Sequence, residues 1–165
     1  MRFDLFYTSD TEEYKYSVIR SLEKVYGASV IDRGRLDIYK DAFNIRRRQH
    51  DAHILLDFLI RNMTSEHALW IVDEDIYYND YNFVMGLAMY DLAGVVSTYR
   101  LYSGAMVAKE CVHEAGHVLG LDHCGNRCVM HFSSSIEDAA KKPDDLCIRC
   151  RGILNRKIIE PGPLL

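Results

Sequence analysis

The stretch His113–Met130, HEAGHVLGLDHCGNRCVM, decides how this sequence is interpreted. It carries three histidines and a glutamate in the pattern HExxHxxGxxH, at positions His113, Glu114, His117 and His123. Three neutral imidazoles, an open fourth position and a neighbouring carboxylate are what a catalytic zinc site needs. Average composition would produce the whole pattern in only about one chain of this length in 10⁵. The spacing therefore predicts a catalytic zinc site.

Helix geometry explains the spacing of these residues. His113 and His117 lie one turn along a helix and about 40° apart around it, so both can ligate one ion. Glu114 reaches the same side and can act on a metal-bound water without ligating the metal. His123 can return to the ion only if the chain leaves the helix, and Gly120 can adopt the left-handed conformation that ends a helix. The alternative, an apolar core helix with incidental histidines, would bury imidazoles that each need a polar partner.

Length and composition indicate an ordinary soluble domain. The chain has 165 residues, of which 48% are hydrophobic and 27% charged, and this suits a single domain with a sizeable core. A net charge of −4 and a pI near 5.9 argue against a nucleic-acid partner. The longest apolar run, 83–96, is interrupted by Asp91 and is too short to span a membrane. Residues 1–7 lack a signal-peptide core, so we expect a cytoplasmic protein, and we expect it to be a monomer.

Hydrophobic periodicity predicts alternating strands and helices. Strands are expected at residues 2–7, 28–32, 69–72, 83–88 and 94–99. Helices are expected at residues 11–26, 50–63, 105–119 and 143–154. This order predicts an α/β (α+β) fold in which a mixed, mostly parallel, twisted sheet is flanked by helices.

We expect these elements to form one domain over residues 1–165. Residues 1–104 would form its sheet-and-helix part, and residues 105–155 would carry the metal-binding helix and the cysteines. Residues 156–165 would form the tail, and its last part, the sequence EPGPLL at 160–165, should be loose.

The five cysteines predict a second metal site. Cys124 and Cys128 form a C-x₃-C pair, and Cys147 and Cys150 form a C-x₂-C pair. In a reducing compartment such pairs indicate a metal, and four thiolates around one tetrahedral ion make a closed structural zinc site. Disulfides or four unlinked thiols remain alternatives. Cys111 lies roughly 200° around the helix from the first histidine and is expected to be a buried, inert thiol.

The combined motif resembles the archaemetzincin family, which belongs to the metzincin clan of zinc metallopeptidases. The resemblance is carried by the pattern at 113–123, by the cysteine directly after its last histidine, and by Met130 and the later C-x-x-C. It covers residues 113–150 and is highly specific there. It implies a zincin-like fold with an active-site helix and a methionine-containing turn, the Met-turn.

The resemblance also implies a role for each motif residue. His113, His117 and His123 would bind a catalytic zinc, and Glu114 would be the general base. The four paired cysteines would bind a second, structural zinc. Met130 would form the turn beneath the first zinc, giving two zinc ions in each chain.

The sequence departs from the family pattern at two places. Three residues separate the first two cysteines, where the family usually has four, and a Gly/Asn-containing loop can absorb that difference. Some metzincins place a tyrosine two residues after the methionine, but this chain has Phe132 there. A phenolic helper would have to come from elsewhere, and the sequence does not rank its candidates. These are Tyr77, Tyr78, Tyr81, Tyr99 and Tyr102.

The implied chemistry is hydrolysis of a peptide bond in a peptide or protein substrate. The substrate would lie extended along the strand expected at 83–88, which resembles the edge strand that metzincins pair with substrate. His131 is not expected to be a ligand, because the third histidine is already accounted for. Two alternatives remain: a metal-containing peptide-binding or regulatory module with little proteolytic activity, and a hydrolase of a non-peptide amide.

Overall fold

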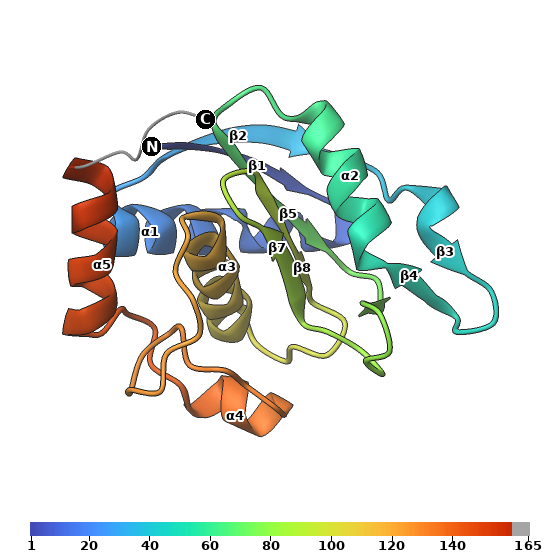
Figure 1. The fold of residues 1–165 in the computed structure, drawn as a ribbon. Coiled ribbons are helices and arrows are strands. Elements are labelled where there is room, and N and C mark those ends of the chain that lie inside the picture. The colour runs from blue at the N-terminus through green and yellow to red at the C-terminus, as the bar shows by residue number, and fades with distance from the viewer. Residues whose placement is uncertain (160–165) are drawn as a thin grey trace.

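A five-stranded sheet forms the centre of the computed structural model, which describes residues 1–159 (Figure 1). Its strands are β1 (Arg2–Tyr7), β2 (Ser29–Arg35), β5 (His67–Val72), β7 (Gly86–Met89) and β8 (Ala93–Ser97). Their spatial order is β2-β1-β5-β8-β7, with four parallel strands and an antiparallel β7 at one edge. The mixed, mostly parallel sheet is therefore confirmed.

Helices cover both faces of this sheet. The α-helices are α1 (Lys15–Tyr26), α2 (Ala52–Asn62), α3 (Gly104–Val118), α4 (Ile136–Lys141) and α5 (Ile148–Ile159). Two 3₁₀ helices, η1 (Ser9–Tyr14) and η2 (Lys40–Ala42), lie before α1 and α2. In Figure 1, α1 and α3 share one face of the sheet and α2 lies on the other.

Alternation along the strands explains the two covered faces. Successive side chains of a strand point to opposite sides of the sheet. Leu69 and Ile71 pack in the core beneath α1 and α3, whereas Trp70 and Val72 pack beneath α2. All four are fully buried, so β5 is apolar on both faces, as a central parallel strand should be.

A small second sheet was not expected from the sequence. It consists of β3 (Phe43–Asn44), β4 (Gln49–Asp51) and β6 (Ile76–Tyr77). The helix expected at 50–63 therefore begins later than predicted, because His50 belongs to β4 and pairs with Phe43 and Ile76. The Asp51 carboxylate then accepts hydrogen bonds from the N–H groups of His53 and Ile54, so α2 begins only at Ala52.

Other element boundaries also differ from the expected ones. The helix expected at 11–26 is split into η1 and α1, and the strand expected at 83–88 is shorter, at 86–89. The last helix was expected at 143–154, but α5 spans 148–159, so Cys147 precedes the helix and Cys150 lies inside it. The helix α4 was missed. The part of the expected tail at 160–165 lies outside the described residues.

None of the helices within residues 1–159 combines the length and the apolar composition that crossing a membrane requires.

Candidate active site and metal centres

The three motif histidines converge at the end of α3. The Nε2 atoms of His113 and His117 lie 3.1 Å apart, and a ring nitrogen of His123 lies within 4.8 Å of both. Two nitrogens bound to one tetrahedral zinc at about 2.1 Å would be about 3.4 Å apart. The separation in the structure therefore fits two ligands of a single ion.

Hydrogen bonds orient two of these rings. The Nδ1 atom of His113 lies 2.8 Å from the Val129 carbonyl oxygen, and that of His117 lies 2.8 Å from the Leu121 carbonyl oxygen. A neutral imidazole that donates from Nδ1 keeps the Nε2 lone pair free for a metal. Burial lowers the pKa of all three histidines, most strongly that of His113, and so favours the neutral, ligating form.

The chain turns back after α3 as the motif predicts. Gly120 has a φ of +81°, and its N–H donates to the His117 carbonyl oxygen. The next N–H, that of Leu121, donates to the Gly116 carbonyl oxygen and completes the end of the helix. The left-handed glycine is confirmed, and it is what allows His123 to join the other two rings.

Glu114 lies beside the histidines and is buried, with 5% of its surface exposed. One of its carboxylate oxygens, one of Glu110 and a ring nitrogen of His113 lie within 4.8 Å of one another. Burial, together with the negative charge of Glu110, raises the pKa of Glu114 well above its ordinary value. A carboxylate held in this way is a strong proton acceptor next to the candidate metal position.

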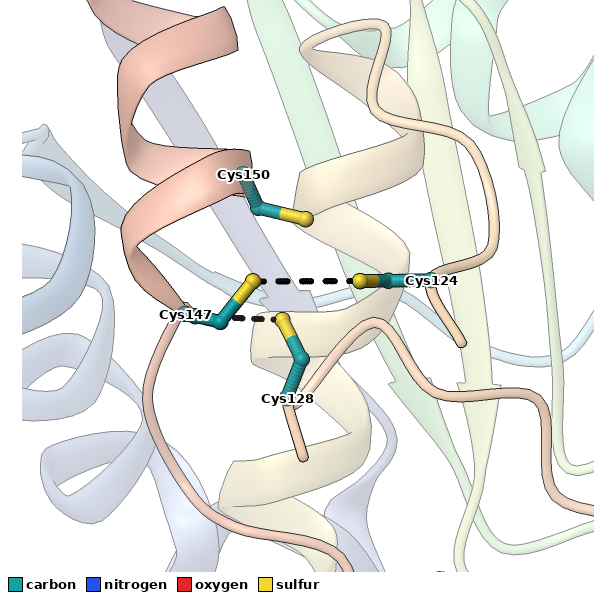
Figure 2. Close-up of side chains that lie close together, drawn as sticks. All are labelled: Cys124, Cys128, Cys147 and Cys150. Carbon is teal, nitrogen blue, oxygen red and sulfur yellow. Dashed lines mark hydrogen bonds between the residues drawn. The ribbon is translucent and has the colours of Figure 1, made fainter. Parts of the chain in front are cut away.

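The four paired cysteines form a second cluster (Figure 2). Their sulfur atoms point toward one another and all lie within 4.8 Å. Cys124 and Cys128 come from the loop after α3, Cys147 comes from the residue directly before α5, and Cys150 lies in the first turn of α5. The Sγ atoms of Cys124 and Cys147 are 3.8 Å apart. Four thiolates at about 2.3 Å from a tetrahedral zinc would be separated by about 3.8 Å, whereas a disulfide needs about 2.05 Å.

Backbone N–H groups surround the same sulfurs. The N–H of Cys147 donates to Cys128 Sγ at 3.2 Å, and the N–H of Asn126 donates to Cys124 Sγ at 3.4 Å. A hydrogen bond from the backbone of Cys150 lowers the pKa of Cys147 to about 6. The pKa of Cys150 itself is raised by burial. The N–H donors favour thiolates, which are the form that binds zinc.

The loop from Cys124 to Met130 joins the two clusters. The N–H of Cys124 donates to the Met130 carbonyl oxygen at 2.9 Å, and the N–H of His131 donates to the Cys128 carbonyl oxygen at 3.0 Å. Met130 is fully buried, and its sulfur packs so closely on Gly116 that a methyl group there would collide with it. The methionine thus lies under the helix segment between the first two histidines. The ring of His131 contacts the Cys124 carbonyl oxygen and is not in the histidine cluster.

A cleft of about 940 Å³ opens over the histidine cluster. Its walls are β7, α3 and the segment after Met130, so the edge strand does border the site. Of the five tyrosines considered from sequence, Tyr78 and Tyr81 line this cleft, and Tyr90, which was not considered, lines it too. Phe132 also lines it, with its ring 5.0 Å from that of His123.

Sequence reasoning missed three charged residues of this cleft, Glu110, Lys142 and Lys157. Glu110 lies four residues before Glu114 on α3, so helical spacing could have placed both carboxylates on one face. Lys142 directly follows α4, a helix that was not expected, and no local pattern connects it with α3.

Comparison with known proteins identifies the family of this chain. The model of peptidase family M54 matches residues 30–156. An archaemetzincin of Nanoarchaeum equitans is 47% identical over 121 residues, which cover 73% of this chain and 71% of that protein. The chain belongs to the archaemetzincin family. It is therefore a zinc-dependent metallopeptidase, as the motif predicts.

Further archaemetzincins extend the likeness to nearly the whole chain. One from Halobacterium salinarum is 34% identical over 169 residues and covers 92% of this chain and 98% of its own. The crystal structure of the archaemetzincin of Methanopyrus kandleri superposes with a TM-score of 0.87 at 30% identity, covering 96% of both chains. That of Archaeoglobus fulgidus, complexed with malonate, superposes with a TM-score of 0.82 at 33% identity and covers 92% of this chain and 99% of that one.

Proposed function

We propose that His113, His117 and His123 bind the catalytic zinc of this archaemetzincin and that Glu114 is the general base for peptide-bond hydrolysis. The observation that carries the proposal is the convergence of three imidazoles, two of them oriented by hydrogen bonds, beside a buried carboxylate in one cleft. The donor set suits zinc, because three neutral nitrogens leave a fourth position open.

Zinc bound at these histidines would polarise the scissile carbonyl and lower the pKa of a water molecule toward neutrality. The carboxylate of Glu114 would take a proton from that water and deliver it to the leaving amine. The burial that raises the pKa of Glu114 makes it a better acceptor for this transfer. A base confined against one strand and one helix also has little freedom to turn away from the reacting water.

The substrate would bind as an extended segment along the outer edge of β7. This strand pairs with β8 on one side only, and its other edge borders the cleft. A free strand edge offers backbone N–H and C=O groups to a peptide, which gives affinity for any sequence. Peptides or proteins are therefore the expected substrates, ahead of a non-peptide amide.

The four cysteines would bind a second, structural zinc that holds the floor of the active site. The sulfur separation and the N–H donors around the thiols support this site. Cys124 directly follows His123, so fixing its sulfur also restrains the backbone of the third catalytic ligand. A single metallopeptidase domain acting as a cytoplasmic monomer stays our expectation for the protein as a whole.

The experiment that tests the proposal compares the wild type with Glu114→Gln on a peptide library. We expect equal zinc content and a loss of cleavage of about 10²–10⁴-fold in Glu114→Gln, because the amide cannot accept the proton. The matched control is Glu137→Gln, which changes an exposed glutamate of α4 and should cleave like the wild type. Cleavage by Glu114→Gln at the wild-type rate would refute the proposed role.

A further inference from the structure

Two polar side-chain atoms in the cleft wall are buried without a hydrogen-bond partner among residues 1–159. They are the hydroxyl oxygen of Ser133 and the ammonium nitrogen of Lys142. Buried polar groups in folded proteins nearly always have a partner, so each such atom needs an explanation. The other atoms of this kind in the described chain, in His67 and Trp70, do not line the cleft.

Lys142 is held in place by a charge on α3. Its ammonium lies 3.0 Å from a carboxylate oxygen of Glu110, and the two side chains are 2% and 5% exposed. The contact is an ion pair with a single carboxylate oxygen, so it occupies at most one of the three N–H groups of the ammonium. Glu110 therefore balances the charge of the ammonium and leaves at least two N–H groups free to donate elsewhere.

A carboxylate is the group that satisfies these donors best. An ammonium has three N–H donors and a serine hydroxyl has one, and a carboxylate offers two oxygens that accept from both. A hydrogen bond from an ammonium to a charged oxygen is about twice as strong as a neutral one. A cationic substrate group would be repelled by the ammonium of Lys142. Glu110 is already paired with that ammonium, so it would not attract such a group.

The position of this pair limits which part of a substrate can reach it. Glu110 lies four residues, or about 6 Å along the helix, before Glu114 on the same face of α3. Oxygens of the two carboxylates lie within 4.8 Å of each other. A carboxylate bound at Lys142 is thus within one residue's reach of the bond that Glu114 would act on.

We propose that Lys142 and Ser133 form a binding site for a substrate carboxylate in the residue next to the scissile bond. The carboxylate is either an acidic side chain or the free C-terminus of the peptide. The proposal rests on the proposed function, because it places the site relative to Glu114. The contacts along the strand edge do not depend on the substrate sequence. The site at Lys142 and Ser133 would therefore give the cleft its preference for anionic substrates.

The test measures binding and cleavage with matched peptides. Pairs of short peptides differ only in Asp against Asn, Glu against Gln, or a free against an amidated C-terminus. We expect the carboxylate member of one pair type to bind the zinc-loaded Glu114→Gln protein about 10- to 100-fold more tightly. Wild-type kcat/KM should show the same preference, and the pair type that responds identifies the source of the carboxylate.

Substitution of the lysine should remove this preference. In Lys142→Met, the carboxylate and amide peptides should bind equally well. Ser133→Ala should reduce the preference by a smaller factor, because one neutral donor is lost. Equal binding of both peptides by the protein that retains Lys142, or an undiminished preference in Lys142→Met, would overturn the proposal.

Two further variants guard against a purely structural effect. Lys142→Met leaves Glu110 as an unpaired buried charge, so Glu110→Gln/Lys142→Met provides a variant without that charge, and it should also lack the preference. Lys109→Met is the matched control, because its ammonium donates to the Ala139 and Ala140 carbonyl oxygens and does not line the cleft. Lys109→Met should keep the preference for carboxylate peptides. If Lys109→Met also lost that preference, the loss in Lys142→Met would be due to a displaced α4. Cleavage of amide and acidic peptides at equal rates would refute this inference alone and leave the role of Glu114 intact.

Discussion

At the level of single residues, the absence of a side chain at Gly86 places β7 against the candidate base. A Cβ atom built there would lie 2.6 Å from both Cγ and Oε1 of Glu114. Atoms at that distance overlap, so any larger residue would push the Glu114 carboxylate away from its position. The glycine therefore fixes how closely the edge strand and the base approach each other.

We predict that Gly86→Ala lowers kcat/KM by about 10²-fold, because a displacement of about 1 Å in a reacting group has that effect. Zinc content should remain that of the wild type, since no metal ligand is touched. Gly125→Ala is the matched control, because a Cβ at Gly125 meets no atom within 4 Å. Steady-state kinetics decide the prediction, and an unchanged kcat/KM in Gly86→Ala would count against the assigned position of Glu114.

Single residues also show what sequence could predict. The histidines, Glu114 and the four paired cysteines were predicted because metal binding requires fixed donor types at short, regular spacings. Lys142 could not be predicted, because its partner Glu110 lies far away in the chain and the contact exists only after folding. The contact between Gly86 and Glu114 could not be predicted for the same reason.

At the level of elements, the cysteine cluster ties the start of α5 to the loop that carries His123 and Met130. We predict that Cys147→Ala loses one zinc per chain, lowers the Tm and weakens binding of the remaining zinc by about 10- to 100-fold. The reason is that the loop loses its anchor. Thermal unfolding and titration with a zinc chelator measure both effects.

Cys111→Ala is the matched control for this experiment. Cys111 is fully buried in the core on α3 and lies outside the cysteine cluster. It should keep two zinc ions and the wild-type chelator titration. If Cys147→Ala behaved like Cys111→Ala, the proposed structural zinc would have no effect on the active site.

The buried carboxylate of Asp4 on β1 also links separate elements. It is hydrogen-bonded to β2 and to the segment directly before β5. It accepts hydrogen bonds from Arg33 Nε at 2.7 Å and from the N–H groups of Thr64 and Ser65 at 2.6 and 2.8 Å. Burial would raise the pKa of Asp4, but these hydrogen bonds outweigh it and lower the pKa from 3.8 to about 2. The lower pKa means that the folded state favours the ionised carboxylate.

The lowered pKa predicts how stability depends on pH. The ionised Asp4 contributes about 2 kcal/mol of folding free energy above pH 4, and this contribution is lost as pH falls toward 2. Asp4→Asn should therefore be less stable than the wild type at pH 7, and the difference should shrink between pH 5 and pH 2. Urea unfolding at several pH values measures it, with Asp10→Asn as an exposed control. A difference that stays constant with pH would contradict the assigned hydrogen bonds.

Elements with long apolar patterns were predicted well, and short ones were not. The strand at 2–7 and the helix around the HExxH motif have many buried positions at one period, so their extents were close to those observed. The strands of the small sheet are two or three residues long and carry no readable period. Asp51 shows how one capping carboxylate moves a helix start by two residues.

At the level of the whole molecule, the two candidate metal centres share one hydrophobic core. The side chains of Cys124, Cys128, Cys150 and Met130 pack in the same buried cluster as α1, α3 and the adjacent face of the sheet. The histidine site lines the cleft between β7, α3 and the segment after Met130. The loop from Cys124 to Met130 connects this site with the cysteine cluster, so the same core supports both centres.

The mixed sheet was predictable because the central strands β5 and β8 are apolar along most of their length, as strands covered on both faces should be. The closeness of the two centres was implied by the adjacent positions of His123 and Cys124. The way in which Ser133 and Lys142 come to line the cleft depended on tertiary contacts that no sequence period encodes.

The central claim, two zinc sites that meet at His123 and Cys124, is tested most directly by native mass spectrometry of the zinc-loaded protein. We predict two zinc ions per chain in the wild type and one in a Cys147→Ala/Cys150→Ala variant. A His113→Ala/His117→Ala variant should also retain one, now held by the cysteines. A single zinc ion in the wild type, or the loss of both ions on changing the histidines alone, would contradict two separate sites.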